Sequence, residues 1–260
     1  MGEIEALVRG RVSALLPQAD IDGGRDGEPV RVGKYSEQYG LSLVPTKHLL
    51  ADEGSYFIAT TPTPGTGIAM TISTAFSDTV AMFAIKNTEA PGPLAKRIYL
   101  DYLRLILLGT APTAVVTRHF ALKRSTADRE PTTAANKTVM TPVNMRSGAG
   151  RGSIARVLSY SAAAAMTVPA SSPGDPVVGR VGLPTGLGIS GDEYFVKFGG
   201  ESMPVKVGLT AVRATDPARV IGVAPPVILE PGEWLVIHEW CLTEATNGPT
   251  FEHELAWFER

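Results

Sequence analysis

Two glutamates near the end of the chain have the residue type and the spacing for acid–base chemistry. Glu252 and Glu254 are separated by one residue in a segment where apolar and polar side chains alternate. In a strand, this spacing places both carboxylates on one face, about 7 Å apart, which is compatible with the acid–base pair of an inverting glycosidase. Both groups would, however, lie on the same side of a substrate, whereas the acid and the base must flank the bond. We therefore interpret the pair as a solvated or salt-bridged edge of a sheet.

The histidines show no metal-binding spacing, since they stand alone at His48, His119, His238 and His253. The best candidate for a metal site or an acid–base pair is His238 with His253, which could face each other across a hairpin formed by the last two strands. A histidine satisfied beside Trp240 or Trp257 is the commoner arrangement. The single cysteine, Cys241, lies in a strand-like run, so we expect a buried, inert thiol and no intrachain disulfide.

Two other motifs could bind ligands. The string Gly186–Gly191 (GLGISG) matches the dinucleotide fingerprint, but that site needs a helix after the glycines. A strand-like run follows here, so we interpret the string as a turn. Arg146, Arg151 and Arg156 gather around a long loop and could bind an anion or an acidic partner, although three arginines are too few to indicate nucleic acid. The sequence therefore assigns no catalytic, cofactor-binding or metal-binding residue, and we expect a protein that is not an enzyme.

Composition narrows the class of protein. The chain has 260 residues, a formal charge of −2 and a pI near 6.1, which argue against a nucleic-acid-binding surface. Charged residues make up only 19%, below the roughly 25% of average globular chains. Partners could cover part of the surface, although a strand-rich chain with many glycines and prolines could look the same. No run reaches the ~18 apolar residues of a membrane span, and charges interrupt the first residues where a secretion signal would be apolar.

The elements that position these residues are strands. All three tryptophans fall in two runs, 233–243 and 250–259, whose alternating aromatic side chains indicate core strands. The segment Leu229–Glu233 (LEPGE) between strand-like runs has the proline and glycine of a tight turn. Leu103–Leu108 is nearly all apolar, so we expect a strand that is covered on both faces.

Further strand-like runs recur from residue 55 onwards with turn residues between them and no intervening helical pattern. This spacing predicts an all-β protein built as an antiparallel sandwich or barrel rather than from alternating strands and helices. The expected strands are Ser55–Thr60, Gly67–Ala75, Thr79–Asn87, Lys96–Leu108, Thr113–Lys123, Ser153–Ser161, Val177–Gly182, Glu193–Gly199, Pro204–Arg213, Arg219–Leu229, Glu233–Thr243 and Thr250–Glu259.

The first fifty residues differ from the rest. Apolar residues at helical spacing predict an amphipathic helix over Glu3–Leu16, which could dock on its own domain or reach a neighbouring subunit. The Gly/Asp-rich Asp20–Pro29 lacks the closing glutamate of a calcium loop, so we interpret it as a linker. We expect an N-terminal helix and arm over 1–50 and a β domain over 51–260. Within the latter, Ser125–Gly152 has no periodicity and is expected to be a long contact loop.

Several strings resemble structural proteins of tailed bacteriophages. They are Ser55–Ala69 (SYFIATTPTPGTGIA), Lys96–Ile106 (KRIYLDYLRLI), Met140–Asn144 (MTPVN), Ala224–Trp240 (APPVILEPGEWLVIHEW) and Phe251–Arg260 (FEHELAWFER). None of these strings contains a catalytic motif. The resemblance implies a jelly-roll β-sandwich that serves as a decoration or cement protein on the capsid surface of the virion, made in the host cytoplasm. It also implies two partners, the major capsid protein and further copies of the chain in a homotrimer.

The residues leave two other functions open. A tail or vertex protein that grips host-surface glycan would also suit a jelly roll, with exposed aromatic rings as stacking platforms. A glycan hydrolase using Glu252, Glu254 or His238 would need these groups to converge in a pocket.

Overall fold

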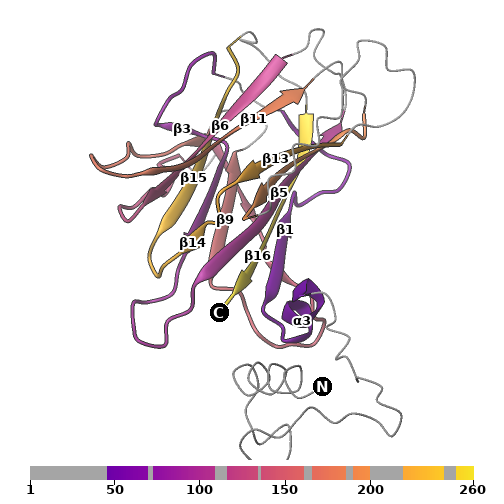
Figure 1. The fold of residues 1–260 in the computed structure, drawn as a ribbon, viewed down its shortest axis with the longest axis vertical. Helices are drawn as coiled ribbons and strands as arrows, with labels where there is room; N and C mark the ends of the chain where they lie inside the picture. The colour runs from indigo at the N-terminus through magenta and orange to yellow at the C-terminus, as the bar shows by residue number, and fades with distance from the viewer. Residues whose placement is uncertain are drawn as a thin grey trace, which may run out of the picture. The chain divides into compact units, whose positions relative to one another are not determined.

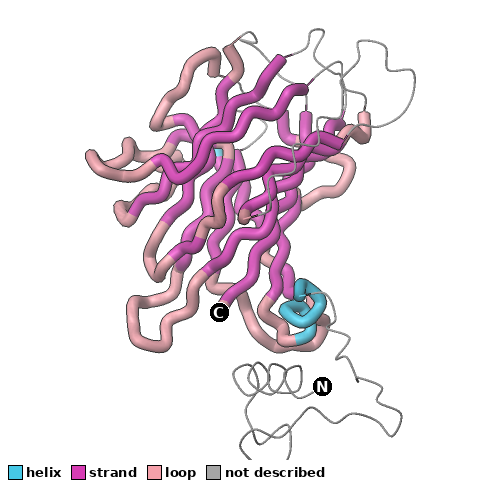
Figure 2. Tube along the Cα trace, viewed as in Figure 1, coloured by secondary structure: helices cyan, strands magenta, loops and turns pink. Residues whose placement is uncertain are grey.

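The computed structural model describes residues 46–69, 73–108, 116–133, 136–160, 166–185, 190–199, 219–242 and 250–260. Residues 47–260 form one compact unit, in which strands predominate and a short helix, α3 (Thr46–Asp52), precedes the first strand (Figure 2). The expected helix Glu3–Leu16, the linker Asp20–Pro29 and the strand Pro204–Arg213 lie outside the described residues. The division of the chain at residue 50 stays a prediction. Within the described ranges, no helix is long and apolar enough to cross a bilayer.

Two sheets pack face to face around one core, so the expected all-β sandwich is confirmed. Sheet I has the strand order β13 (Arg219–Ala224), β12 (Glu193–Phe198), β5 (Ile98–Leu108), β16 (Thr250–Glu259), β1 (Tyr56–Thr60) and β8 (Val143–Asn144), with β14 (Ile228–Leu229) paired to β5 and β2 (Ile68–Ala69) paired to β16. Sheet II has the order β11 (Val177–Thr185), β6 (Val116–Ser125), β15 (Trp234–Trp240), β4 (Phe83–Asn87), β9 (Ala155–Tyr160) and β7 (Lys137–Met140). A separate pair joins β3 (Val80–Ala81) to β10 (Met166–Thr167).

Eight of these strands pair in a nested order. Taken along the chain as β1, β4, β5, β6, β11, β12, β15 and β16, the first pairs with the last, the second with the seventh, the third with the sixth and the fourth with the fifth, all antiparallel. Two further pairs, β16 with β5 and β15 with β6, join the four nested pairs into the two sheets. Figure 1 shows β16 (yellow) between β1 and β5. The consecutive strands β15 and β16 therefore lie in different sheets, and the expected hairpin between them is wrong.

One strand pair is parallel, which the sequence did not predict. β13 runs parallel to β12 at the edge of sheet I, and a parallel neighbour needs a crossover rather than a tight turn. β13 also contacts β11 at the edge of sheet II. A Cβ atom on Gly222 would lie 2.3 Å from Val181 Cγ1, so the glycine permits a close approach that closes this side of the sandwich.

The segment 125–152 is not one long loop, contrary to expectation. It contains β7 and β8, which add an edge strand to sheet II and to sheet I respectively. These strands are only four and two residues long, too short for a period-two pattern to stand out. Val139, Val143 and Met145 are 53%, 55% and 50% exposed. We call these three side chains the edge patch.

The burial pattern along each strand can be compared with the alternation of inward and outward side chains expected from the sequence. The agreement is closest in β16. Phe251, His253, Leu255 and Trp257 are buried in the core, while Glu252, Glu254 and Phe258 are half-buried on the other face. Ala256 lies on that other face but is buried in a cluster with Leu50 and Tyr56. β5 also alternates, with its outward side chains half-buried, so the expectation that Leu103–Leu108 is covered on both faces is wrong. Six of the seven residues of β15, by contrast, are buried, because the segment 73–82 lies over the outer face of sheet II.

Candidate functional site

A hollow of about 240 Å³ lies on the outer face of sheet I and brings together the two glutamates singled out from the sequence. Strands β5, β16 and β1 form its floor, and the segment 61–67 forms a wall. We call it the sheet I hollow; its lining residues are Thr60, Thr61, Pro64, Arg104, Ile106, Glu252, His253 and Glu254.

The charged side chains of the sheet I hollow form a ladder across three strands. Arg104 on β5 lies opposite Glu254 on β16 and next to Glu193 on β12, with its terminal nitrogens 3.4 Å and 3.2 Å from their carboxylate oxygens. Tyr102 donates its hydroxyl to Glu254 Oε1 at 2.8 Å. Burial, then this hydrogen bond, raises the pKa of Tyr102. The Glu252 carboxylate accepts a hydrogen bond from the backbone N–H of Gly65. The predicted salt bridge is therefore present for Glu254. β16 lies between β5 and β1, however, so the expectation that the pair marks the edge of a sheet is wrong.

The wall of the hollow is held firmly to β16. Thr61 donates its N–H to His253 O at 2.9 Å, and His253 returns its own N–H to Thr61 Oγ1 at 2.8 Å. Between β1 and β2 the chain turns at Pro64 and Gly65, with Thr66 N–H bonded to Thr63 O at 3.2 Å and Gly65 at φ 79°. Proline followed by a glycine of positive φ is the sequence of a type II turn. The wall is thus preorganised.

A bulge in β5 adds a second polar cluster to the outer face. The pairing of β5 with β16 skips Asp101, and a bulged residue re-aims its side chain. Asp101 Oδ2 accepts a hydrogen bond from Tyr56 OH at 2.6 Å and lies 2.6 Å from Lys47 Nζ of α3. Burial, then the contact with Asp101, raises the pKa of Tyr56. In the sequence, Asp101 is only an aspartate within an apolar run, and nothing there indicates its contacts with Tyr56 and Lys47.

The two late histidines do not face each other. His253 lies in the core, where its Nδ1 is 2.9 Å from Ser159 Oγ of sheet II and burial lowers its pKa to about 3. His238 points away from the core on sheet II, with Nδ1 2.8 Å from Val80 O, and burial lowers its pKa too. The predicted pair is wrong because β15 and β16 lie in different sheets. Each histidine instead packs against a phenylalanine, His253 against Phe83 and His238 against Phe76, rather than against Trp257 or Trp240 as expected. Both have a structural role.

Asp78 joins the segment over sheet II to the sheet beneath it. Its carboxylate accepts hydrogen bonds from Lys123 Nζ at 2.7 Å and from the N–H of Ser171 at 2.6 Å, with Arg129 Nη1 3.7 Å away. Burial alone would raise the pKa of Asp78, but the bonds from Lys123 and Ser171 and the charge of Arg129 outweigh it and hold the pKa below its usual range. This cluster therefore has a structural role, because it attaches the segment that contains Asp78 to sheet II.

The three arginines of the expected anion patch have separate acceptors. Arg146 donates to Asp52 O at 2.5 Å, Arg156 to Glu130 Oε1 at 2.7 Å, and Arg151 lies 3.9 Å from Glu259 Oε2. They do not converge on one site, so the patch prediction is wrong.

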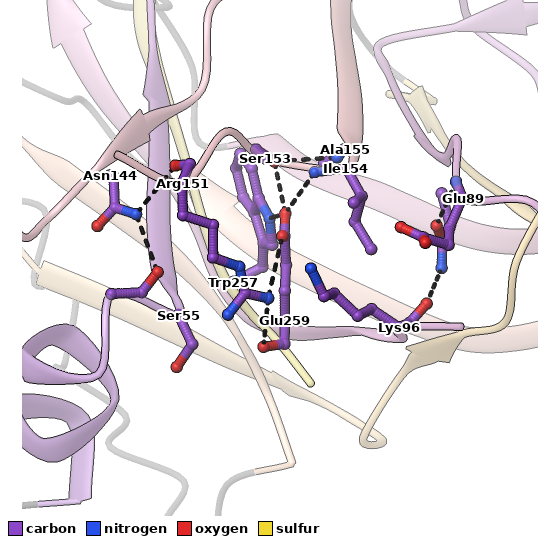
Figure 3. Close-up of polar contacts among 12 residues, drawn as sticks. Ser55, Glu89, Lys96, Asn144, Arg151, Ser153, Ile154, Ala155, Trp257 and Glu259 are labelled. Carbon is purple, nitrogen blue, oxygen red and sulfur yellow. Dashed lines mark hydrogen bonds and ion pairs between the residues drawn. The ribbon is translucent and has the colours of Figure 1, made fainter. Parts of the chain in front are cut away.

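Glu259 is a buried carboxylate that the sequence did not single out. Figure 3 shows it accepting hydrogen bonds from Ser153 Oγ, the N–H of Ile154 and Trp257 Nε1, at 2.5, 3.0 and 3.1 Å. The residue is 0% exposed. This cluster ties the end of β16 to the segment before β9 and stabilises the fold.

The remaining sequence motifs are structural where they are described. Gly191 has φ 97° and is followed by β12 without a helix, so the interpretation of this end of the motif as a turn is confirmed; residues 186–189 lie outside the described ranges. Cys241 is fully buried, as expected. No group of three or more histidine, cysteine, aspartate or glutamate side chains in the described ranges has the geometry of a metal site.

No protein-family model, no curated protein and no solved structure matches this chain.

Proposed function

We propose that this chain is a non-enzymatic structural protein of a bacteriophage virion, a jelly-roll decoration or cement protein that binds the shell formed by the major capsid protein. One observation carries the proposal: the nested pairing of eight strands, first with last through fourth with fifth. This order supports a jelly roll, an architecture that recurs in viral capsid domains. The strings that resemble phage structural proteins include β1, β5, β15 and β16, four of these eight strands.

The two carboxylates that could have formed an acid–base pair are bound by other groups of the chain. Glu254 is bonded to Tyr102 and paired with Arg104, and Glu252 accepts the Gly65 N–H. Both carboxylates stand on one strand and on the same side of the hollow, whereas the acid and the base of a glycoside hydrolase flank the bond that breaks. This supports a role for the sheet face in shape and contact rather than in a reaction.

The edge patch suits contact with a second copy of this chain. Val139 of β7 and Val143 of β8 stand at the edges of the two sheets, on strands with one hydrogen-bonded neighbour each among the described residues. Edge strands with exposed apolar side chains are templates for pairing with another chain. Two such edges side by side provide both backbone groups and apolar area, so we place the contact of the proposed homotrimer here.

Particles that lack this chain provide the test of the shell role. Purified protein added back to such particles should bind to saturation and raise the temperature at which the shell dissociates, because a ligand that binds only the intact shell stabilises it. A cryo-EM map of the reconstituted particle should show the sandwich on the capsid surface. Absence of binding to the shell, or an unchanged dissociation temperature at full occupancy, would contradict the proposal.

A further inference from the structure

We propose that the sheet I hollow binds a neutral, hydroxyl-rich ligand of the size of one sugar ring. The inference does not depend on the shell role, since any protein that carries this hollow would bind the same chemistry. It starts from the volume of the hollow, about 240 Å³. Pockets for drug-sized ligands span roughly 300–1,000 Å³, so this one is suited to a single ring.

The charges of the lining select against ions of either sign. Glu252 and Glu254 contribute two negative charges and Arg104 one positive charge. The excess of negative charge repels phosphates, sulfates and acidic sugars. A cation would be attracted by the carboxylates but would lie beside the guanidinium of Arg104. A neutral hydroxyl group avoids both penalties, because it donates to a carboxylate and accepts from a guanidinium.

Arg104 also offers hydrogen-bond donors to a ligand. Its two terminal nitrogens contact Glu254 and Glu193, and the guanidinium carries five N–H groups in all. A terminal nitrogen can therefore also donate to a ligand hydroxyl in the hollow that Arg104 lines. The guanidinium also lies 6.0 Å from the ring centroid of Phe195, which helps to fix its orientation.

The rest of the lining matches the two kinds of surface on a sugar ring. Thr60 and Thr61 carry hydroxyl groups, while Pro64 and Ile106 are apolar and could contact the C–H face of the ring. The two hydrogen bonds between Thr61 and His253 and the turn at Gly65 hold the wall in place. Preorganisation of this kind lowers the entropy lost on binding.

Titration of the full chain with neutral methyl glycosides of glucose, galactose, mannose and N-acetylglucosamine, followed by amide chemical shifts in NMR, tests the proposal. We expect at least one of them to cause saturable shifts centred on Gly65 and the residues around Glu252 and Glu254, with a Kd on the order of 1 mM. Inorganic phosphate and spermidine, as anionic and cationic probes, should shift the same amides less.

Three variants locate the binding. Arg104→Met and Glu254→Gln each remove one charged hydrogen-bonding group and should weaken binding about tenfold or more. Ile106→Phe fills the hollow without changing a charge and should abolish binding, which covers the case where a charge variant fails to fold. The control is Arg124→Met, which makes the same change at a separate hollow of about 200 Å³ lined by Arg124, Asp175 and Glu233; it should bind like the wild type.

The proposal is overturned if no glycoside gives a saturable shift at the hollow, if binding survives in folded Arg104→Met and Ile106→Phe, or if either ionic probe binds there more tightly than every glycoside. Because these readouts use the free chain, they are separate from shell binding. A chain that fails to bind particles could still bind the sugar, and the reverse also holds.

Discussion

His253 shows at the scale of a single residue how burial decides which chemistry a side chain can perform. Its type permits metal binding or acid–base catalysis, yet it lies in the core against Phe83 and Ser159 with a pKa near 3. Glu252 and Glu254 show the opposite case, since their spacing alone was enough to place both on the outer face. Residue type and spacing thus predicted the surface glutamates correctly, whereas the histidines required knowledge of which strands pair.

The buried His253 should make the protein less stable in acid. An unfolded histidine has a pKa of about 6.5, above the folded value of about 3. Above pH ~6.5 this histidine is neutral in both states and does not lower the stability of the folded protein. As the pH falls from about 6.5 towards 3, the unfolded chain binds a proton at this histidine that the folded chain does not bind, so stability is lost. The free energy of unfolding should drop by up to about 1.4 kcal/mol per pH unit between these values.

Urea unfolding of the wild type and His253→Gln at several pH values between about 3.5 and 7 checks this prediction. The difference in stability between the two proteins should shrink as the pH falls, since glutamine does not titrate. His48→Gln, at an exposed histidine of α3, is the matched control and should follow the wild type. Equal pH dependence in His253→Gln and the wild type would refute the assignment.

At the scale of elements, the sequence predicted strands well and their neighbours poorly. The runs that became β1, β5, β12 and β16 were found with nearly the observed bounds, and the turn at Pro231 and Gly232 has the expected form, with Gly232 at φ 81°. Local alternation encodes these features. Sheet membership depends on contacts between distant residues, such as Phe57 with Trp257, and no local period carries that information. The strands β7 and β8 were missed because they are so short.

β13 offers an element-scale test of how the sandwich closes. Gly222→Ala places a methyl group against Val181 and Leu183, at 2.3 and 2.9 Å from their nearest atoms. We expect a loss of about 1–3 kcal/mol in the free energy of unfolding, the usual effect of overpacking a tight contact. The measurement is the midpoint of denaturant unfolding.

The matched control for this prediction is Gly92→Ala. Nothing lies within 4 Å of the Cβ position at Gly92, so the same substitution should change stability by no more than about 1 kcal/mol. Equal effects at the two positions would mean that β13 does not lie against β11 as the structure has it.

The unit of residues 47–260 combines a body of two sheets with a lateral edge that carries exposed apolar side chains. The edge patch supplies three of the side chains that are large, hydrophobic and exposed, within seven residues of sequence. Composition had suggested that partners cover part of the surface, and this edge is one place where large apolar side chains are exposed; Val177 on β11 and Ile221 on β13 are others. The sequence could not have located it, because β7 and β8 were expected to be loop.

Self-association through the edge patch predicts a concentration-dependent sedimentation coefficient. The wild type should shift from monomer to trimer as its concentration rises, and Val139→Asp with Val143→Asp should remain monomeric because buried carboxylates without partners are costly. Val177→Asp, at a valine on β11 with 43% exposure, is the control and should assemble normally. A wild type that stays monomeric at every concentration, or a double variant that assembles as well as the wild type, would rule out this contact.

The nested strand order has a consequence for a molecule whose chain is cut. A break in the turn at Ser172–Asp175 would separate β1, β4, β5 and β6 from β11, β12, β15 and β16, and each of the four nested pairs joins one fragment to the other. Alone, the first fragment would leave its two central strands, β5 and β6, without neighbours. Together the two fragments would stay associated through the four nested strand pairs. A protease that cut this turn would therefore cleave the chain without unfolding the protein.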